Sequence, residues 1–146
     1  MSGGLEMSGE RITSTYVLPE PYERAVELLR TALRDEGLKV TLEMDVSGAI
    51  RKELGVDLTS CRVFYVCCPL LLLHAVVVDS SAAALLPVRI VASDRGPQTC
   101  FRLLHPAGAG QDLSSALSVP AGRLWARVGA GLERIGARPA VGANWL

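Results

Sequence analysis

The chain has 146 residues, the size of one domain of roughly 100 to 200 residues, which argues against a multidomain enzyme. Apolar residues make up 49% and charged residues 21%, a globular balance that argues against disorder, collagen-like repeats and coiled coils. Fifteen basic residues cancel fifteen acidic ones, so no global positive field steers a phosphate backbone towards the protein. We therefore expect a soluble globular domain with no nucleic-acid partner.

The first two predicted elements are a strand and a strong helix. Residues 12–18 are rich in β-branched and aromatic side chains and end at Pro19, which favours a strand. Pro21 fits the first turn of the helix that follows, and Gly37 ends it with a left-handed residue. Spacings of three and four place one apolar stripe on this helix, which consists of Tyr22, Ala25, Val26, Leu29, Ala32 and Leu33.

A second strand and a second helix are predicted next. Residues 38–44 alternate between apolar and polar side chains, so we expect Leu38, Val40, Leu42 and Met44 to share one buried face. Asp45 then caps a helix that stops at Gly55. The apolar positions of this helix predict an inner face of three residues, namely Ala49, Ile50 and Leu54.

The third pair of elements lies in an uncharged apolar run. Residues 62–67 favour a strand that is hydrophobic on both faces, and Pro69 opens a helix that reaches about Val78. Residues 63–78 carry no formal charge, but sixteen residues are fewer than the roughly 20 that cross a bilayer. We therefore expect a buried strand and a buried helix with no membrane span, and keep a membrane segment as the alternative.

Two strands and a long helix complete the predicted domain. Residues 86–92 and 99–104 favour an antiparallel hairpin joined by the turn-rich segment 93–97. Ser118 is predicted to cap a last helix over residues 119–135, with a buried stripe of Leu124, Trp125, Val128, Leu132 and Ile135. Its other side carries Arg123, Arg127 and Arg134, for which a solvated face is preferred to an anion site.

The order βαβαβαββα predicts an α+β fold with one mixed sheet covered by helices. We expect one domain over residues 11–136, between a flexible N-terminal tail (1–10) and a C-terminal tail (137–146). No charged-then-apolar signal segment opens the chain, and four cysteines are too few for a disulfide-rich scaffold. These features predict a cytoplasmic location.

The most suggestive residues for chemistry are Cys67, Cys68 and Pro69. A strand that ends here and a helix that begins at Pro69 would place the sulfurs beside free backbone N–H groups, which lowers a thiol pKa. One interpretation is a nucleophilic, sulfur-carrying or metal-binding thiol. The other is a cysteine that only packs in the core, because cysteine is among the most buried residue types.

Further polar candidates are His74, Cys100 and His105. Their spacings relative to Cys67 match no zinc or iron-sulfur pattern, so we predict no metal site. His74 lies in an apolar predicted helix, where a core histidine is expected more often than a ligand. The sequence indicates no cofactor, because no dinucleotide, phosphate-loop, zinc-protease or nucleophile-elbow motif occurs.

Several short blocks in a fixed order resemble the domain-of-unknown-function 302 family over about residues 12–106. The blocks are Asp45-Val46, Arg51 to Val56, Cys67-Cys68-Pro69, Leu85-Leu86-Pro87 and His105-Pro106. This resemblance implies a fold of the TATA-binding-protein type, with a curved sheet and packed helices. It also implies a homodimer, and it implies no established activity.

The same resemblance marks departures at the polar positions. Cys67 matches a family cysteine and Pro69 a family proline, while Cys68 stands in place of an asparagine. Val88 stands in place of a second family cysteine, and His105 in place of an aspartate. If the two family cysteines act as a redox or metal-binding pair, this chain lacks the second one, unless Cys68 or Cys100 substitutes for it.

Two functional hypotheses follow from the sequence. The preferred one is a non-enzymatic, dimerising module that binds a small ligand or another protein, with Cys67, Pro69, His74 and His105 as candidate ligand-binding residues. The alternative is a thiol-dependent sulfur, redox or metal-binding protein that uses Cys67 as its reactive thiol, with Cys67 and Cys68 as candidate catalytic residues.

Overall fold

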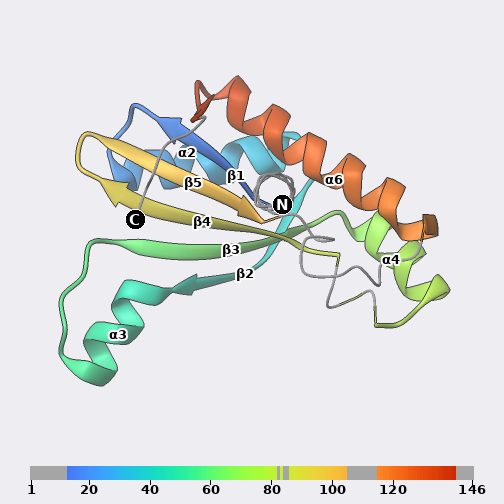
Figure 1. Cartoon of the computed structure of the whole chain (residues 1–146), viewed down its shortest axis with the longest axis horizontal. Coiled ribbons are helices and arrows are strands. Elements are labelled where there is room, and N and C mark those ends of the chain that lie inside the picture. Colours follow the sequence, from blue (N-terminus) through green and yellow to red (C-terminus); the bar gives the residue numbers. More distant parts are fainter. Residues whose placement is uncertain (1–12, 82, 84–85, 105–114, 141–146) are drawn as a thin grey trace, which may run out of the picture.

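The computed structural model describes residues 13–81, 83, 86–104 and 115–140 (Figure 1). Four helices and six strands lie in this part of the chain. The strands are β1 (Thr13–Leu18), β2 (Lys39–Asp45), β3 (Cys61–Cys67), β4 (Val88–Arg95), β5 (Gln98–Leu104) and β6 (Arg138–Pro139). The helices are α2 (Tyr22–Asp35), α3 (Val46–Leu54), α4 (Pro69–Val78) and α6 (Ser115–Arg134).

The six strands form one sheet in the order β2-β3-β4-β5-β1-β6. The predicted α+β class with a single sheet is confirmed, but each pairing is antiparallel and the sheet is not mixed. The crossover through α2 does give β1 and β2 the same direction. Because three other strands lie between them, this parallel relation never becomes a neighbouring pair.

Helix α2 follows its predicted pattern closely. All six residues of its apolar stripe are buried. Gly37 adopts a φ of 73°, and the amides of Gly37 and Leu38 donate to the carbonyls of Arg34 and Leu33 at 2.9 Å each. This pair of hydrogen bonds is a Schellman motif, which needs a left-handed residue that glycine adopts without strain.

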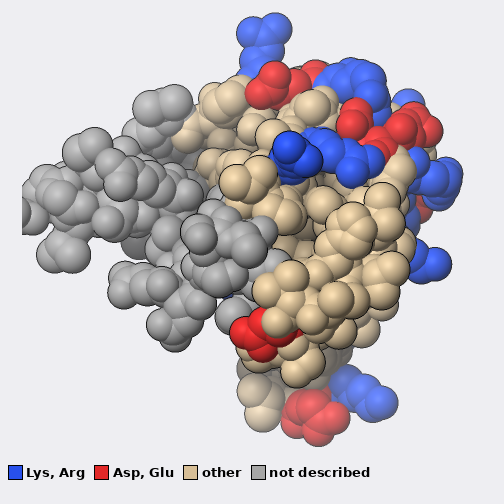
Figure 2. All heavy atoms as spheres, turned by 90° about the vertical axis from the view of Figure 1, so that its right-hand side faces the viewer, with Lys and Arg blue, Asp and Glu red and all other residues tan. Residues whose placement is uncertain are grey.

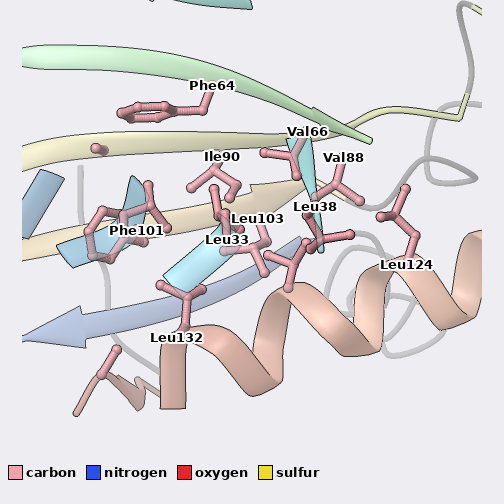
Figure 3. Packing of buried hydrophobic residues seen from close by; sticks show 14 of the residues in the cluster. Leu33, Leu38, Phe64, Val66, Val88, Ile90, Phe101, Leu103, Leu124 and Leu132 are labelled. Carbon is pink, nitrogen blue, oxygen red and sulfur yellow. The ribbon is translucent and has the colours of Figure 1, made fainter. Parts of the chain in front are cut away.

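The core lies between one face of the sheet and the helices α2 and α6. Val88, Ile90 and Ala92 of β4 are buried there, while the residues between them are half-exposed. Leu124, Val128 and Leu132 of α6 are each 0% exposed, as the predicted stripe requires. Figure 3 shows side chains from β3, β4, β5, α2 and α6 meeting in this one layer.

The outer elements β2 and α3 differ from prediction. A register shift between Val40 and Leu42 reverses the alternation of β2, so Leu42 is 56% and Met44 49% exposed. In α3, Asp45 caps the helix through a 3.0 Å bond from the Gly48 amide, as expected. The predicted inner face is wrong, however, because the helix stands off the sheet (Figure 1) and Leu54 is 72% exposed.

The last helix and the C-terminal segment also extend beyond prediction. Helix α6 begins at Ser115, so Ser118 lies inside it and is not its cap. Pro120 interrupts only the hydrogen bond that its missing N–H would make, and the helix continues through it. Residues 138–139, expected in a tail, pair with β1 as β6, and Ala140 donates to the Thr15 carbonyl at 2.8 Å.

The apolar run that raised a membrane alternative forms β3 and α4, with boundaries as predicted. No helix in the described part of the chain is long and apolar enough to cross a bilayer. The expected burial of α4 is wrong, because Ala75 is its only buried residue. The apolar side chains of α4 instead lie largely at the surface.

Candidate functional site

The junction between β3 and α4 lies where the sequence places it. Cys67 is the last residue of β3, Cys68 is the N-cap of α4, and Pro69 is its first helical residue. Proline suits this position because its φ is already helical and its missing N–H needs no partner in the first turn. The residue before it is driven to an extended conformation, and Cys68 has a φ of −104° and a ψ of 119°.

Cys67 points into the protein and is 2% exposed. Burial is the main cause that raises the pKa of its thiol, and the neighbouring Cys68 raises it further. The amine of Lys39, which pairs with Cys67 across the sheet, lowers this pKa by less. A buried thiol with a raised pKa is a poor nucleophile at neutral pH.

Cys68 lies in the environment that the sequence predicted for both cysteines. Its sulfur makes no full capping hydrogen bond, yet the amide of Leu71, and to a smaller extent that of Leu70, lowers the pKa of its thiol. The Arg127 guanidinium lowers this pKa as well, with Nη1 3.7 Å from Sγ. Of these two cysteines, Cys68 is the better placed to form a thiolate.

Arg127 joins three elements at this point. Besides Cys68, its guanidinium donates to the Glu36 carbonyl at the end of α2. Nearby, Arg134 donates to Glu36 Oε2 at 2.6 Å and to the Ala32 carbonyl at 3.3 Å. Both arginines therefore neutralise the negative end of α2. The expected solvated arginine face on α6 is accordingly wrong for Arg127, which is half-buried, while Arg123 and Arg134 are exposed.

A cleft of about 460 Å³ lies beside this junction. Residues of the second half of α2 and the start of β2 line it, together with Pro69. Arg30, Arg34 and Lys39 bring positive charge to its lining, and Glu43 brings one negative charge. Pro69 is thus the one predicted ligand-binding residue that lines the cleft, and the cationic lining was missed from the sequence.

The remaining candidates lie apart from the junction. Cys100 pairs with Ser93, which pairs with Cys61, at the other end of β3 from Cys67. Six residues of strand span about 20 Å, so Cys100 cannot act together with Cys67. Cys100 is also 1% exposed, and burial raises the pKa of its thiol.

The two histidines do not join this site in the described structure. His74 lies at the surface of α4, where a core histidine had been expected. His105 lies outside the described residues. Within the described ranges, no three histidine, cysteine, aspartate or glutamate side chains gather as a metal site would require.

The structure shows where Val88, which stands in place of a family cysteine, lies relative to Cys67. Val88 lies opposite Val66, the residue before Cys67, and is fully buried. Side chains alternate between the two faces of a sheet, so Val88 shares a face with Val66 and not with Cys67. In this chain, valine therefore fills position 88 with an apolar side chain on the face of Val66.

These features define an α+β domain with a six-stranded antiparallel sheet, two covering helices and a thiol at the start of a peripheral helix. The chain matches the sequence model of the family described as "Domain of unknown function DUF302" over residues 14–114. It therefore belongs to the DUF302 family, as the short motifs indicated.

One solved structure supports the fold. The chain is similar to an uncharacterized conserved DUF302 protein from Bacillus stearothermophilus, with a TM-score of 0.76 and 21% sequence identity. The similarity covers 85% of this chain and 98% of that one, and at this identity it establishes the fold alone. No curated protein matches the chain significantly.

Proposed function

We propose that this protein is a non-enzymatic interaction module that forms a homodimer through α4. The exposed apolar surface of this helix carries the proposal. Leu70 is 61%, Leu73 59% and Val77 77% exposed, and their spacing of three and four places them on one stripe. Val78 is 59% and Val76 37% exposed beside them.

The size of this surface supports a specific contact. Five side chains with these exposures leave on the order of 500 Å² of apolar surface, within the range of the largest, often functional, patch on a monomer. A standard interface uses about 800 Å² per partner. The α4 stripe would therefore form the centre of the interface, and neighbouring surface would form its rim.

The absence of charge on α4 favours a second copy of this chain as the partner. Residues 69–78 contain no lysine, arginine, aspartate or glutamate. Figure 2, which faces the end of the molecule where α4 lies, shows a broad area without charged side chains and with charges mainly around it. In a two-fold contact each surface meets its own copy, so an uncharged surface brings no like-charge repulsion.

The dimer test is sedimentation of the full chain between about 1 and 100 µM, a range that covers specific but moderate interfaces. We expect a dimer for the natural sequence and a monomer for the Leu73→Glu, Val77→Glu double variant, because four carboxylates would meet in the contact. The matched control is Leu54→Glu, at an exposed leucine on α3, which should stay dimeric. A natural chain that is monomeric at 100 µM, or a double variant that remains dimeric, would overturn the proposal.

The thiols support the non-enzymatic form of this proposal. All four cysteines are free, the state that a reducing cytoplasm maintains. Cys67 is buried, which disfavours a redox role for this thiol. The thiol-dependent alternative retains one observation in its favour, namely the lowered pKa of Cys68. If it holds, Cys68→Ser will abolish thiol reactivity without changing the dimer.

A further inference from the structure

Some of the charged side chains that line the cleft between α2 and β2 form ion pairs, and others do not. Arg30 donates to both carboxylate oxygens of Glu43, at 2.9 and 2.8 Å, and also contacts Glu27. The Arg30 guanidinium lowers the pKa of Glu43, which keeps this carboxylate ionised and paired. The only negative group in the lining is thus already neutralised by its neighbour.

Two other cations of the lining remain available. Across the described ranges, neither Arg34 nor Lys39 takes part in an ion pair. A helix end would ordinarily use a nearby cation such as Arg34 to balance its carbonyls. Here, Arg127 and Arg134 from α6 already donate to carbonyls at the end of α2. Arg34 and Lys39 are therefore free to face an external anion.

The rest of the lining is apolar. Apolar side chains in the cleft come from Leu38, just before β2, from Val40 of β2 and from Pro69. Its volume of about 460 Å³ falls within the 300 to 1,000 Å³ range of small-ligand sites. A cleft with two unpaired cations and an aliphatic wall suits an anion that carries an aliphatic body better than a fully hydrated inorganic anion.

We infer that this cleft binds a small aliphatic carboxylate, with its carboxylate between Arg34 and Lys39 and its hydrocarbon part against Val40 and Pro69. The inference does not rest on the dimer, because none of its cationic residues belongs to α4. It also differs from the thiol hypothesis, since no covalent step is involved.

The binding test follows amide resonances of the full-length protein during titration with sodium hexanoate, with 1-hexanol and inorganic phosphate as parallel probes. We expect saturable shifts at cleft residues with hexanoate. Binding of either other probe should be about tenfold or more weaker, because hexanol lacks the carboxylate and phosphate lacks the hydrocarbon part. The Arg34→Gln, Lys39→Gln double variant should weaken hexanoate binding by about tenfold or more. Arg24→Gln, an exposed arginine of the same helix outside the cleft, is the matched control and should bind as the natural chain does.

Three results would overturn the inference. The first is no saturable shift with hexanoate up to about 50 mM, weaker than any affinity of interest. The second is unchanged binding in the double variant, and the third is phosphate binding as tight as hexanoate binding. The monomeric Leu73→Glu, Val77→Glu variant should still bind hexanoate, so failure of this inference and failure of the dimer proposal are distinguishable.

Discussion

Helices α4 and α6 are both rich in apolar residues, yet the fold uses them in opposite ways. Helix α6 buries Leu124, Val128 and Leu132 completely, whereas α4, with no formally charged residue, buries only Ala75. Apolar content therefore does not decide burial. Position relative to the sheet decides it, since α6 lies along the sheet and α4 lies beyond the strand ends (Figure 1).

The patterning of the two helices fits this difference. In α6, the residues between the buried positions are mostly arginine, glycine or alanine, so the large apolar side chains form one stripe that a single rotation of the helix about its axis buries. Helix α4 has apolar side chains on all sides, so no single rotation is preferred and some of them face solvent however it docks. An all-apolar helix is typical of a fully enclosed element, and its exposure here is the observation on which the proposed dimer rests.

The largest expected effect comes from truncating one leucine in each helix. Leu132→Ala should lower the free energy of unfolding by about 3 kcal/mol, because it leaves a cavity in the closed core. Leu73→Ala, at a residue that is 59% exposed, should change it by less than about 0.5 kcal/mol. Urea denaturation measures both, at a concentration where the protein is monomeric. Equal losses would show that α4 packs as tightly as α6 and would remove the contrast between them.

A second comparison concerns two glycines that end helices with positive φ. Gly37 has a φ of 73° and Gly55 one of 69°. An added Cβ would lie 3.1 Å from Arg127 Nη2 at Gly37, and would meet nothing within 4 Å at Gly55. Gly55→Ala should cost about 1 kcal/mol from backbone strain alone, and Gly37→Ala about 2 kcal/mol, because it also displaces Arg127, one of the two arginines that join α6 to the end of α2.

Thermal denaturation of the two glycine variants provides this measurement. Arg123→Met, at an exposed residue of α6 that makes no such contact, is a useful reference for changes on that helix. A Gly37 variant no less stable than the Gly55 variant would mean that Arg127 adds nothing to the attachment of α6.

The smallest expected effect is a shift in thiol reactivity, with little change in stability. Because the Leu71 amide and Arg127 lower the pKa of Cys68, its thiolate fraction at a given pH is larger than that of an ordinary cysteine. Iodoacetamide should therefore alkylate Cys68 at lower pH than it alkylates Cys67, whose pKa burial raises. Arg127→Met should move the Cys68 profile to higher pH, since it removes a positive charge that favours the thiolate.

Tandem mass spectrometry distinguishes the two adjacent cysteines in this experiment, and Arg123→Met again serves as the control. If the Cys68 profile is the same in both variants, α6 has no electrostatic contact with the first turn of α4. Alkylation of Cys67 ahead of Cys68 would instead restore the original assignment of the reactive thiol.

The sequence by itself determined where most elements begin and end. Gly37, the cap at Asp45, Gly55 and Pro69 act within a few residues of their own position, so each can be read without knowing the rest of the fold. The stripes of α2 and α6 were equally readable, because an amphipathic helix has only one face that can be buried. The β3–α4 junction, and with it the place of the candidate thiols, followed from the same local rules.

Only the tertiary structure decided which surfaces those elements present. The bulge in β2 turns Leu42 outward, and the position of α4 beyond the sheet leaves its leucines exposed. The choice between Cys67 and Cys68 depends on the burial of Cys67 and in part on Arg127, which is 59 residues from Cys68 in the sequence. The cleft likewise joins α2, β2 and Pro69. Local propensity fixes backbone conformation within a few residues, but burial, charge pairing and pKa depend on contacts between segments that only folding brings together.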